Sequence, residues 1–194
     1  MMTYVLPLIA YLIGSVSSAI VVSKLMGLQD PRAVGSKNPG ATNVLRYGGK
    51  KAAAFTLLGD VLKGVLPVVL ARALKVDPTT LALVMLAAFL GHLYPVYHGF
   101  RGGKGVATAI GVITAVNPWV GLALVVTWFV MTLLFRYSSL SAITAALLAP
   151  VYVWYLIPAP PLLIATCVMV TLLVWRHRNN IRKLLSGTED KIRF

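Results

Sequence analysis

Four glycines and two cations stand within eight residues near the middle of the chain. The stretch reads H-G-F-R-G-G-K-G over 98–105, and an apolar helix is predicted from Val106 onward. Glycine lets backbone N–H groups approach an oxyanion closely, a helix start offers unpaired N–H donors, and Lys104 adds a positive charge. The stretch is not a Walker A loop, because its spacing is one residue short and Gly105 replaces the Ser or Thr that holds magnesium. It predicts an anion site; the alternative is a basic turn beside a membrane helix.

A second polar stretch reads G-S-K-N-P-G-A-T-N-V-L-R over 35–46. Asn38 before Pro39 predicts an N-cap and first helical residue, with a short helix beginning at about Gly40. Ser36, Asn38 and the first free amides would then point at one place, and Asn43 and Arg46 would share a helix face. The alternative is a helix start without a ligand.

The third polar stretch, R-H-R-N-N-I-R-K over 176–183, is expected to continue the last membrane helix. His177 and Asn180 lie three residues apart and so share one helix face, whereas Arg178 and Arg182 share another. The arginines are typical of an anchor on anionic lipid. His177, with an unperturbed pKa of about 6.5, can donate to a phosphate or accept a hydroxyl proton.

The composition indicates an integral membrane protein. Of 194 residues 58% are hydrophobic and 12% charged, and eighteen Lys and Arg face five acids. So basic and apolar a chain favours a membrane surface or anionic substrates as partners, and no basic domain with interleaved aromatic residues supports nucleic-acid binding. With a single cysteine, Cys167, the fold cannot depend on an intrachain disulfide.

Seven apolar runs predict an all-α, polytopic fold with seven transmembrane helices. They cover about 4–26, 52–73, 81–97, 106–117, 119–135, 140–157 and 162–175. The fourth run is short for the roughly 20 residues that a crossing needs. Seven crossings nevertheless place fifteen of the eighteen Lys and Arg on one side, as the positive-inside rule requires. We therefore expect one membrane domain over 1–194, its N-terminus outside and its C-terminus cytoplasmic, with cytoplasmic inserts 28–51, 98–105 and 136–139 and tail 176–194.

Three ionisable residues fall inside predicted spans. Asp60 and Lys63 are three apart on one helix and can pair, either as functional groups or as a structural ion pair. His92 has no partner at metal-ligand spacing and is interpreted as a hydrogen-bonded packing residue.

The residue types limit the chemistry. Carboxylates, His and Cys are too few for a hydrolytic metal centre, and no Ser-His-Asp arrangement is visible. A site with many anion donors and almost no bases suits a substrate that already has a good leaving group and needs positioning and charge stabilisation.

The three stretches together resemble the signatures of one family, the bacterial membrane glycerol-3-phosphate acyltransferases that use acyl phosphate. The resemblance covers essentially the whole chain and extends to Asp60, Lys63 and Ser139. It implies transfer of a fatty acyl group from acyl phosphate to the 1-hydroxyl of glycerol 3-phosphate, giving lysophosphatidate and phosphate, the first step of phospholipid synthesis. It further implies the bacterial inner membrane, an active site facing the cytoplasm, and neither cofactor nor metal.

The resemblance also implies roles for individual residues. Those expected to hold acyl phosphate and its transition state are Ser36, Asn38, Gly40, Thr42, Asn43 and Arg46. Those expected to bind phosphate, especially that of glycerol 3-phosphate, are Gly102, Gly103, Lys104 and Gly105. His177 and Asn180 complete the site, with Asp60, Lys63 and Ser139 as possible supporting residues. The catalytic set is Ser36, Arg46, Lys104, His177 and Asn180.

Two questions stay open at the level of sequence: which group is the base, and whether the protein is an enzyme, a transporter or a structural partner. The base is hypothesised to be an oxygen of the substrate's own phosphate, with His177 as the alternative. Lys37 stands where the family often has Gly, and Asn179 where an acid is common, so that no carboxylate there orients His177. The rival interpretations are a transporter of anions or lipid phosphate, which would place its substrate near the midplane between repeats, and a structural partner that binds anionic lipid.

Overall fold

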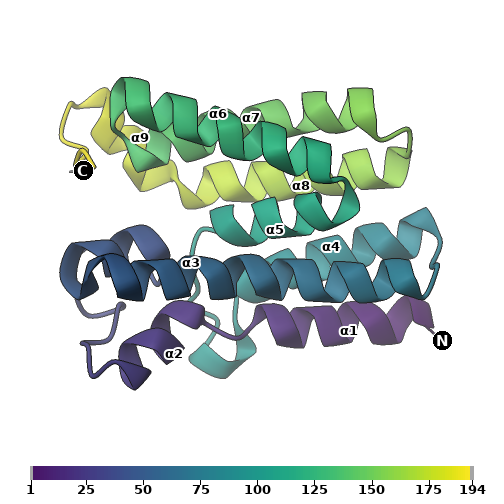
Figure 1. Ribbon diagram of the computed structural model, residues 1–194, viewed down its shortest axis with the longest axis horizontal. Coiled ribbons are helices and arrows are strands. Elements are labelled where there is room, and N and C mark those ends of the chain that lie inside the picture. Colours follow the sequence, from purple (N-terminus) through teal and green to yellow (C-terminus); the bar gives the residue numbers. More distant parts are fainter. Residues whose placement is uncertain (1, 193–194) are drawn as a thin grey trace.

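A computed structural model describes residues 2–192, and every regular element in that range is helical (Figure 1). The elements are α1 (Met2–Gly14), α2 (Ser18–Leu25), α3 (Ala41–Ala73), α4 (Pro78–Leu93), η1 (Val96–His98), α5 (Val106–Val116), α6 (Pro118–Phe135), α7 (Ser138–Leu156), α8 (Pro160–Arg176) and α9 (Arg178–Leu185). The predicted all-α class is confirmed.

Two of the long helices begin with the same side-chain cap. Asp77 accepts hydrogen bonds from the amides of Thr79 and Thr80, and Asn117 accepts from those of Trp119 and Val120. In each case a proline follows at the first helical position, where its missing N–H costs nothing. The Asp-Pro and Asn-Pro pairs therefore start α4 and α6.

The first apolar run is divided rather than continuous. α1 ends at Gly14 and α2 begins at Ser18, and the break leaves the carbonyl oxygen of Val16 free of a helical partner. Lys63 Nζ donates to that oxygen at 2.8 Å. The break thus supplies a hydrogen-bond acceptor inside the apolar body of the protein.

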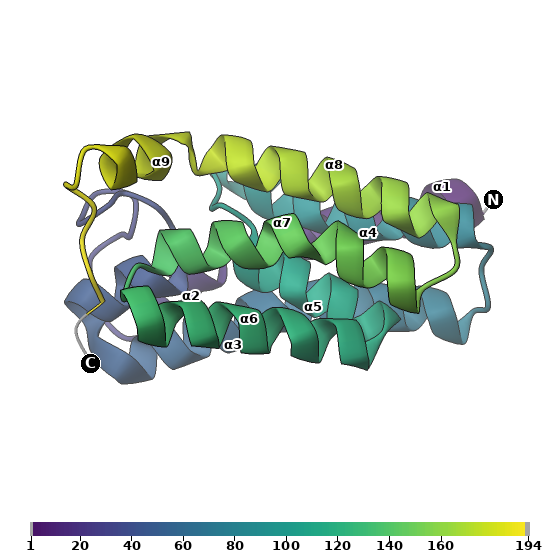
Figure 2. The same cartoon turned by 90° about the horizontal axis from the view of Figure 1, so that it is seen from above.

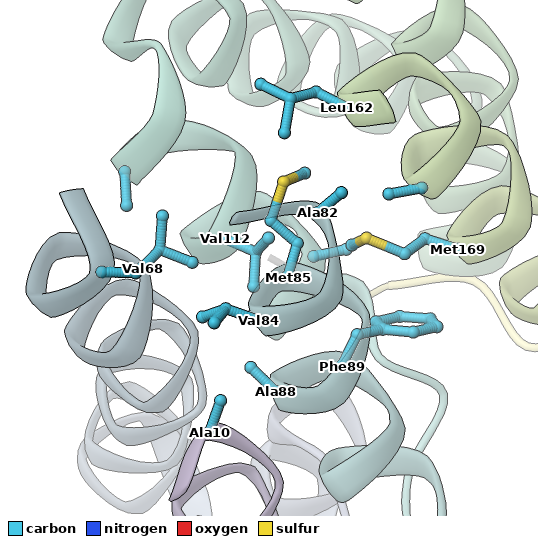
Figure 3. Packing of buried hydrophobic residues seen from close by; sticks show 14 of the residues in the cluster. Ala10, Val68, Ala82, Val84, Met85, Ala88, Phe89, Val112, Leu162 and Met169 are labelled. Atoms are coloured by element: carbon cyan, nitrogen blue, oxygen red, sulfur yellow. The ribbon is translucent and has the colours of Figure 1, made fainter. Parts of the chain in front are cut away.

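The core is centred on α4 (Figure 3). Met85 and Phe89 are fully buried there, between Val68 of α3, Val112 of α5 and Met169 of α8. Glycines bring the neighbouring helices close. A Cβ on Gly14 would lie 2.1 Å from the carbonyl oxygen of Ala88, and similar contacts occur at Gly64, Gly91 and Gly111. Small residues at helix contacts are typical of packing in membranes, where backbones approach each other directly.

Five helical segments are long and apolar enough to span a membrane, or six if α8 and α9 count as one bent span. Their outward faces carry large apolar side chains, including Leu8, Phe55, Leu66, Phe129 and Ile164. This supports a multi-pass membrane protein. α5, with eleven residues, falls short by length, so seven crossings stay a prediction.

The shortness of α5 has a structural explanation. Its last residues lie level with the end of α7, since Asn117 Nδ2 donates to the carbonyl oxygen of Leu156 at 3.3 Å. Its first residues follow a loop that folds back onto the end of α4, where Gly102 donates to the carbonyl oxygen of Leu93. The glycine stretch is thus folded inward against α4, and α5 begins there.

The polar segments gather at one end of the molecule. α2, the first turns of α3, α9 and the C-terminal segment lie together, whereas α1 begins at the opposite end (Figures 1 and 2). The expectation that residues 176–183 continue the last helix is wrong. The chain bends by 56° between α8 and α9, with His177 at the junction.

Candidate functional site

The glycine stretch is held against the end of α4 by its own backbone. The amides of Gly102 and Gly103 donate to the carbonyl oxygens of Leu93 and His92, each at 3.2 Å. A Cβ on Gly102 would lie 2.0 Å from the oxygen of His92, and one on Gly103 would lie 2.2 Å from Nε2 of the same residue. These glycines are therefore required for close approach between the loop and α4.

Arg176 holds the same two residues from the other side. Its Nη2 donates to the carbonyl oxygen of Gly102 at 2.7 Å, and its Nε donates to that of Gly103 at 3.1 Å. The guanidinium also lies 5.8 Å from the ring centre of Tyr94, a cation–π contact. With the backbone of Gly102 and Gly103 thus engaged, the amides left for an anion nearby are those of Lys104, Gly105 and the first turn of α5.

Lys104 projects from this loop to the tail. Its Nζ donates to Oδ1 of Asn180, whose Nδ2 donates in turn to Oε1 of Glu189 at 2.7 Å. Ser139 donates to the same Glu189 oxygen at 2.6 Å. Burial lowers the pKa of the Lys104 ammonium to about 8, although the Glu189 carboxylate acts in the opposite direction. Hydrogen bonds thus connect four residues, which we call the Lys104 group: Lys104, Asn180, Ser139 and Glu189.

The C-terminal segment folds back over this group. Asp190 pairs with Arg46 at 3.2 Å, and the amide of Ile192 donates to the carbonyl oxygen of Arg136 at 2.7 Å. The Lys191 ammonium lies 5.5 Å from the ring centre of Tyr137. The two carboxylates at 189 and 190 therefore contact the groups that a phosphate would need.

Residues 35–46 form a tight loop and then a helix. Asn43 is buried. Its Oδ1 accepts from the amide of Ser36 at 2.9 Å, and its Nδ2 donates to the carbonyl oxygens of Pro31 and Val34. Ser36 is exposed, and within the described residues its hydroxyl makes no hydrogen bond. The Asn43 side chain therefore shapes the loop that presents Ser36.

The predicted N-cap at Asn38 is wrong. α3 begins at Ala41 with Gly40 as its N-cap, because Asn38 and Pro39 belong to the turn before the helix. The short first helix was nonetheless correctly expected, since non-helical backbone at Gly49, with φ of 80°, separates it from the long part of α3. On that first helix, Thr42 shares a hydrogen bond of 3.1 Å with Ser138.

His177 is buried at the junction of α8 and α9. Its Nδ1 lies 2.8 Å from the carbonyl oxygen of Leu173. Because a carbonyl only accepts, Nδ1 carries the proton in this contact, which leaves Nε2 of a neutral ring as an acceptor. The ring is held in one orientation with one nitrogen available.

A buried polar network lies beneath the glycine loop. Lys63 Nζ contacts Asp60 Oδ1 at 2.9 Å, and His92 Nδ1 lies 3.6 Å from the same oxygen. The Thr108 hydroxyl donates to the carbonyl oxygen of Asp60 at 2.9 Å and lies 3.2 Å from His92 Nδ1. The packing interpretation of His92 is consistent with this geometry, and the ring also supports Gly103. Asp60 and Lys63 do not enter the Lys104 group.

An apolar groove runs between α5, α6, α7 and α8. Its lining includes Val106, two residues after Lys104, and Leu173, whose carbonyl oxygen accepts from His177. The other lining residues are mostly small and branched apolar ones, among them Ala109, Ile113, Ala142, Ala146, Ala149 and Met169. Its one hydroxyl, on Thr166, donates to the helix carbonyl of Leu162. The groove is narrow, with about 30 Å³ of free volume, so it offers an alkyl chain an apolar wall beside the polar group and not a preformed cavity.

Sequence reasoning missed three contributors to this site. Glu189 joins Ser139 to Asn180, Arg176 clamps the glycine loop, and Ser138 holds Thr42. The sequence did contain a signal for Glu189, because two of only five acids in the chain are adjacent at 189 and 190. Nothing in the spacing showed that they fold back onto Arg46.

The comparisons agree with one another. A family model described as glycerol-3-phosphate acyltransferase matches residues 4–187. The chain is 60% identical over 183 residues to the glycerol-3-phosphate acyltransferase of Thioalkalivibrio sulfidiphilus, covering 94% of this chain and 90% of that protein. It is 56% identical to that of Methylococcus capsulatus, covering 94% and 92%.

Two crystal structures of PlsY (YgiH), an integral membrane glycerol 3-phosphate acyltransferase, have the same fold. The glycerol 3-phosphate form is 42% identical with a TM-score of 0.94, covering 98% of this chain and 96% of that one. The lysophosphatidic acid form is 40% identical with a TM-score of 0.92, covering 98% and 95%. The family model, the related sequences and the two crystal structures each match nearly the whole chain. The protein therefore belongs to the glycerol-3-phosphate acyltransferase family.

Proposed function

We propose that the protein transfers a fatty acyl group from acyl phosphate to the 1-hydroxyl of glycerol 3-phosphate, giving lysophosphatidate and inorganic phosphate. The observation that carries this proposal is the Lys104–Asn180 contact at the polar end of the apolar groove. There, anion donors meet a surface suited to an alkyl chain. The related structures named for glycerol 3-phosphate and lysophosphatidic acid support the acceptor and product.

The donor's alkyl chain is assigned to the groove and its phosphate to the polar end. The residues of the first insert that bind this phosphate, Asn43 by shaping the loop, are Ser36, Asn38, Gly40, Thr42, Asn43 and Arg46. Lys104 and the start of α5 bind the acceptor's phosphate, with His177 and Asn180 completing the pocket. Support comes from Lys104, since an ammonium in a half-buried site stabilises a phosphate more strongly than one in water.

Attack of the acceptor's hydroxyl oxygen on the acyl carbon forms the ester bond and breaks the bond from that carbon to the phosphate oxygen. The hydroxyl proton goes to a phosphate oxygen, so that hydrogen phosphate leaves. The geometry supplies positioning and positive charge for the oxygen that becomes an oxyanion. His177 contributes a fixed Nε2 for binding, and it is the alternative base.

The direct test supplies purified protein in detergent with palmitoyl phosphate and glycerol 3-phosphate, following phosphate release and lysophosphatidate together. With palmitoyl phosphate, equal amounts of phosphate and lysophosphatidate are expected. With palmitoyl-CoA, neither product is expected. Product from the thioester alone would contradict the acyl phosphate assignment.

His177→Ala separates the two bases. If the substrate phosphate is the base, this substitution weakens substrate binding more than it changes the pH profile of kcat. Because burial lowers the pKa of His177 to about 4, loss of an acid limb near that pH would instead assign the proton transfer to His177.

The proposed orientation follows the gathering of cations at one end. Seven crossings, with α5 as the fourth, place the N-terminus outside, and the site and C-terminus in the cytoplasm of a bacterial inner membrane. In a Cys167→Ser background, Lys51→Cys in spheroplasts is expected to resist an impermeant maleimide, whereas Lys75→Cys is expected to react. The reverse labelling would invert the topology.

A further inference from the structure

A cavity of about 420 Å³ lies against the glycine loop at residues 100–102. It is lined by Arg32, Lys37, Pro39, Phe100, Arg101, Gly102 and Arg176. None of Arg46, Lys104, His177 and Asn180 lines it. Its size is within the range of small-molecule sites, about 300–1,000 Å³. We call it the second basic pocket.

The charges of this pocket are poorly balanced. Arg32 is paired with Asp30, with Nη2 to Oδ2 at 2.7 Å. Lys37 and Arg101 are exposed, and their side chains make no hydrogen bond or ion pair within residues 2–192. Arg176 uses Nε and Nη2 on loop carbonyls, which do not neutralise its charge. Four cations therefore surround a space in which one carboxylate pairs with one of them.

The backbone of the lining is also unusual. Lys37 and Phe100 are non-glycine residues in the left-handed region, with φ of 58° and 59°. Such conformations cost free energy and concentrate at ligand clamps. They occur once in each of the two loops that wall the pocket, where the amide of Lys37 donates to the carbonyl oxygen of Val34 and that of Phe100 donates to the carbonyl oxygen of Pro95.

We propose that the second basic pocket binds a phosphate group separately from the site that contains Lys104. Three cations without a carboxylate partner more than offset the two negative charges of a phosphate monoester dianion, and arginine and lysine are the side chains that recognise it. The phosphate comes either from a small soluble molecule or from the headgroup of an anionic lipid. In the first case, and only if the proposed function holds, the pocket retains glycerol 3-phosphate or released phosphate beside the reaction site.

The test compares two variants that each remove two exposed cations. Lys37→Gln/Arg101→Gln alters the pocket, and Lys50→Gln/Lys51→Gln is the matched control on α3, away from its lining. Binding of inorganic phosphate to protein in neutral detergent is measured by calorimetry without any acyl donor. Failure of the proposed function therefore leaves this result readable.

A soluble source predicts that parent and control bind inorganic phosphate at least tenfold more tightly than the pocket variant, also when Lys104→Ala has removed the other site. A lipid source predicts that nanodiscs containing phosphatidylglycerol abolish this binding, and that the pocket variant retains less of that lipid on purification. Equal phosphate binding and equal lipid retention in the pocket variant and the control would overturn the proposal.

Discussion

Two ion pairs of this molecule lie under opposite conditions. Within the helical body, Asp60 and Lys63 are paired with 4% and 6% of their side chains exposed. At the polar end, Arg46 and Asp190 are paired with 38% and 69% exposed. The first pair is fixed by Val16, His92 and Thr108 as well, whereas the second joins a helix to the last residues of the chain.

The difference separates support from reaction. Buried ions need permanent partners, because an uncompensated charge in an apolar surrounding is expensive. The polar end has more cations than acids, and the two acids that contact Arg46, Ser139 and Asn180 come from the tail, so a substrate phosphate can replace a carboxylate there at little cost. In this glycerol-3-phosphate acyltransferase, Asp60 and Lys63 support the glycine loop through His92, and the cations of the polar end are available to bind substrate.

The largest expected effect is loss of the inner pair. Asp60→Ala leaves Lys63 buried without its counter-ion and is expected to destabilise the protein by about 3–5 kcal/mol. Thermal unfolding in detergent measures this. The double change Asp60→Asn/Lys63→Met removes both charges and is expected to recover much of the loss; an unchanged melting temperature in Asp60→Ala would contradict the assigned role.

The charges of the polar end are tested by Lys104→Ala. Removing this ammonium is expected to lower activity by about 100-fold or more, comparable with deleting one oxyanion-hole donor. The melting temperature is expected to stay close to that of the parent, since the Lys104 side chain is only partly buried. Near-normal kcat/KM would refute its role in binding or catalysis.

Gly103→Ala connects the two regions. The new Cβ would lie 2.2 Å from Nε2 of His92, which the inner network holds in place, so the loop must move. We expect KM for glycerol 3-phosphate to rise by about tenfold, the effect of roughly 1.4 kcal/mol, with a smaller change in kcat. Saturation kinetics identical to those of the parent would show that the loop does not bind the acceptor.

The pH dependence sharpens the assignment of Lys104. Because burial lowers its pKa to about 8, the charged form predominates below that pH and is lost above it. Acceptor kcat/KM, which reports the free enzyme, is expected to fall as pH rises through 8. Lys104→Arg stays charged there and should lack this limb. The same limb in the arginine variant would assign it to another group.

Asp190→Asn is expected to have the smallest effect. An exposed ion pair contributes about 0–1 kcal/mol, so the melting temperature should hardly change. Acceptor KM should fall slightly, because Arg46 loses a competing carboxylate. A loss of stability as large as that of Asp60→Ala would erase the distinction between the two regions.

The sequence by itself was sufficient for the helical membrane class, the family and most members of the polar group. Apolar runs of membrane length predict helices because every backbone group in lipid needs an internal partner. The three signature stretches identified Arg46, Lys104, His177 and Asn180 as candidates, and the Lys104–Asn180 contact joins two of them.

Only the tertiary structure showed where the chain bends or breaks between these residues and which distant groups it brings into contact. The bend at His177, the break at Val16, the return of Glu189 and Asp190 and the clamp by Arg176 all depend on contacts between segments far apart in sequence. Local spacing records which residues share a helix face. It does not record which carbonyl a helix break exposes, or which distant side chain comes to occupy it, since the packing of the whole fold decides both.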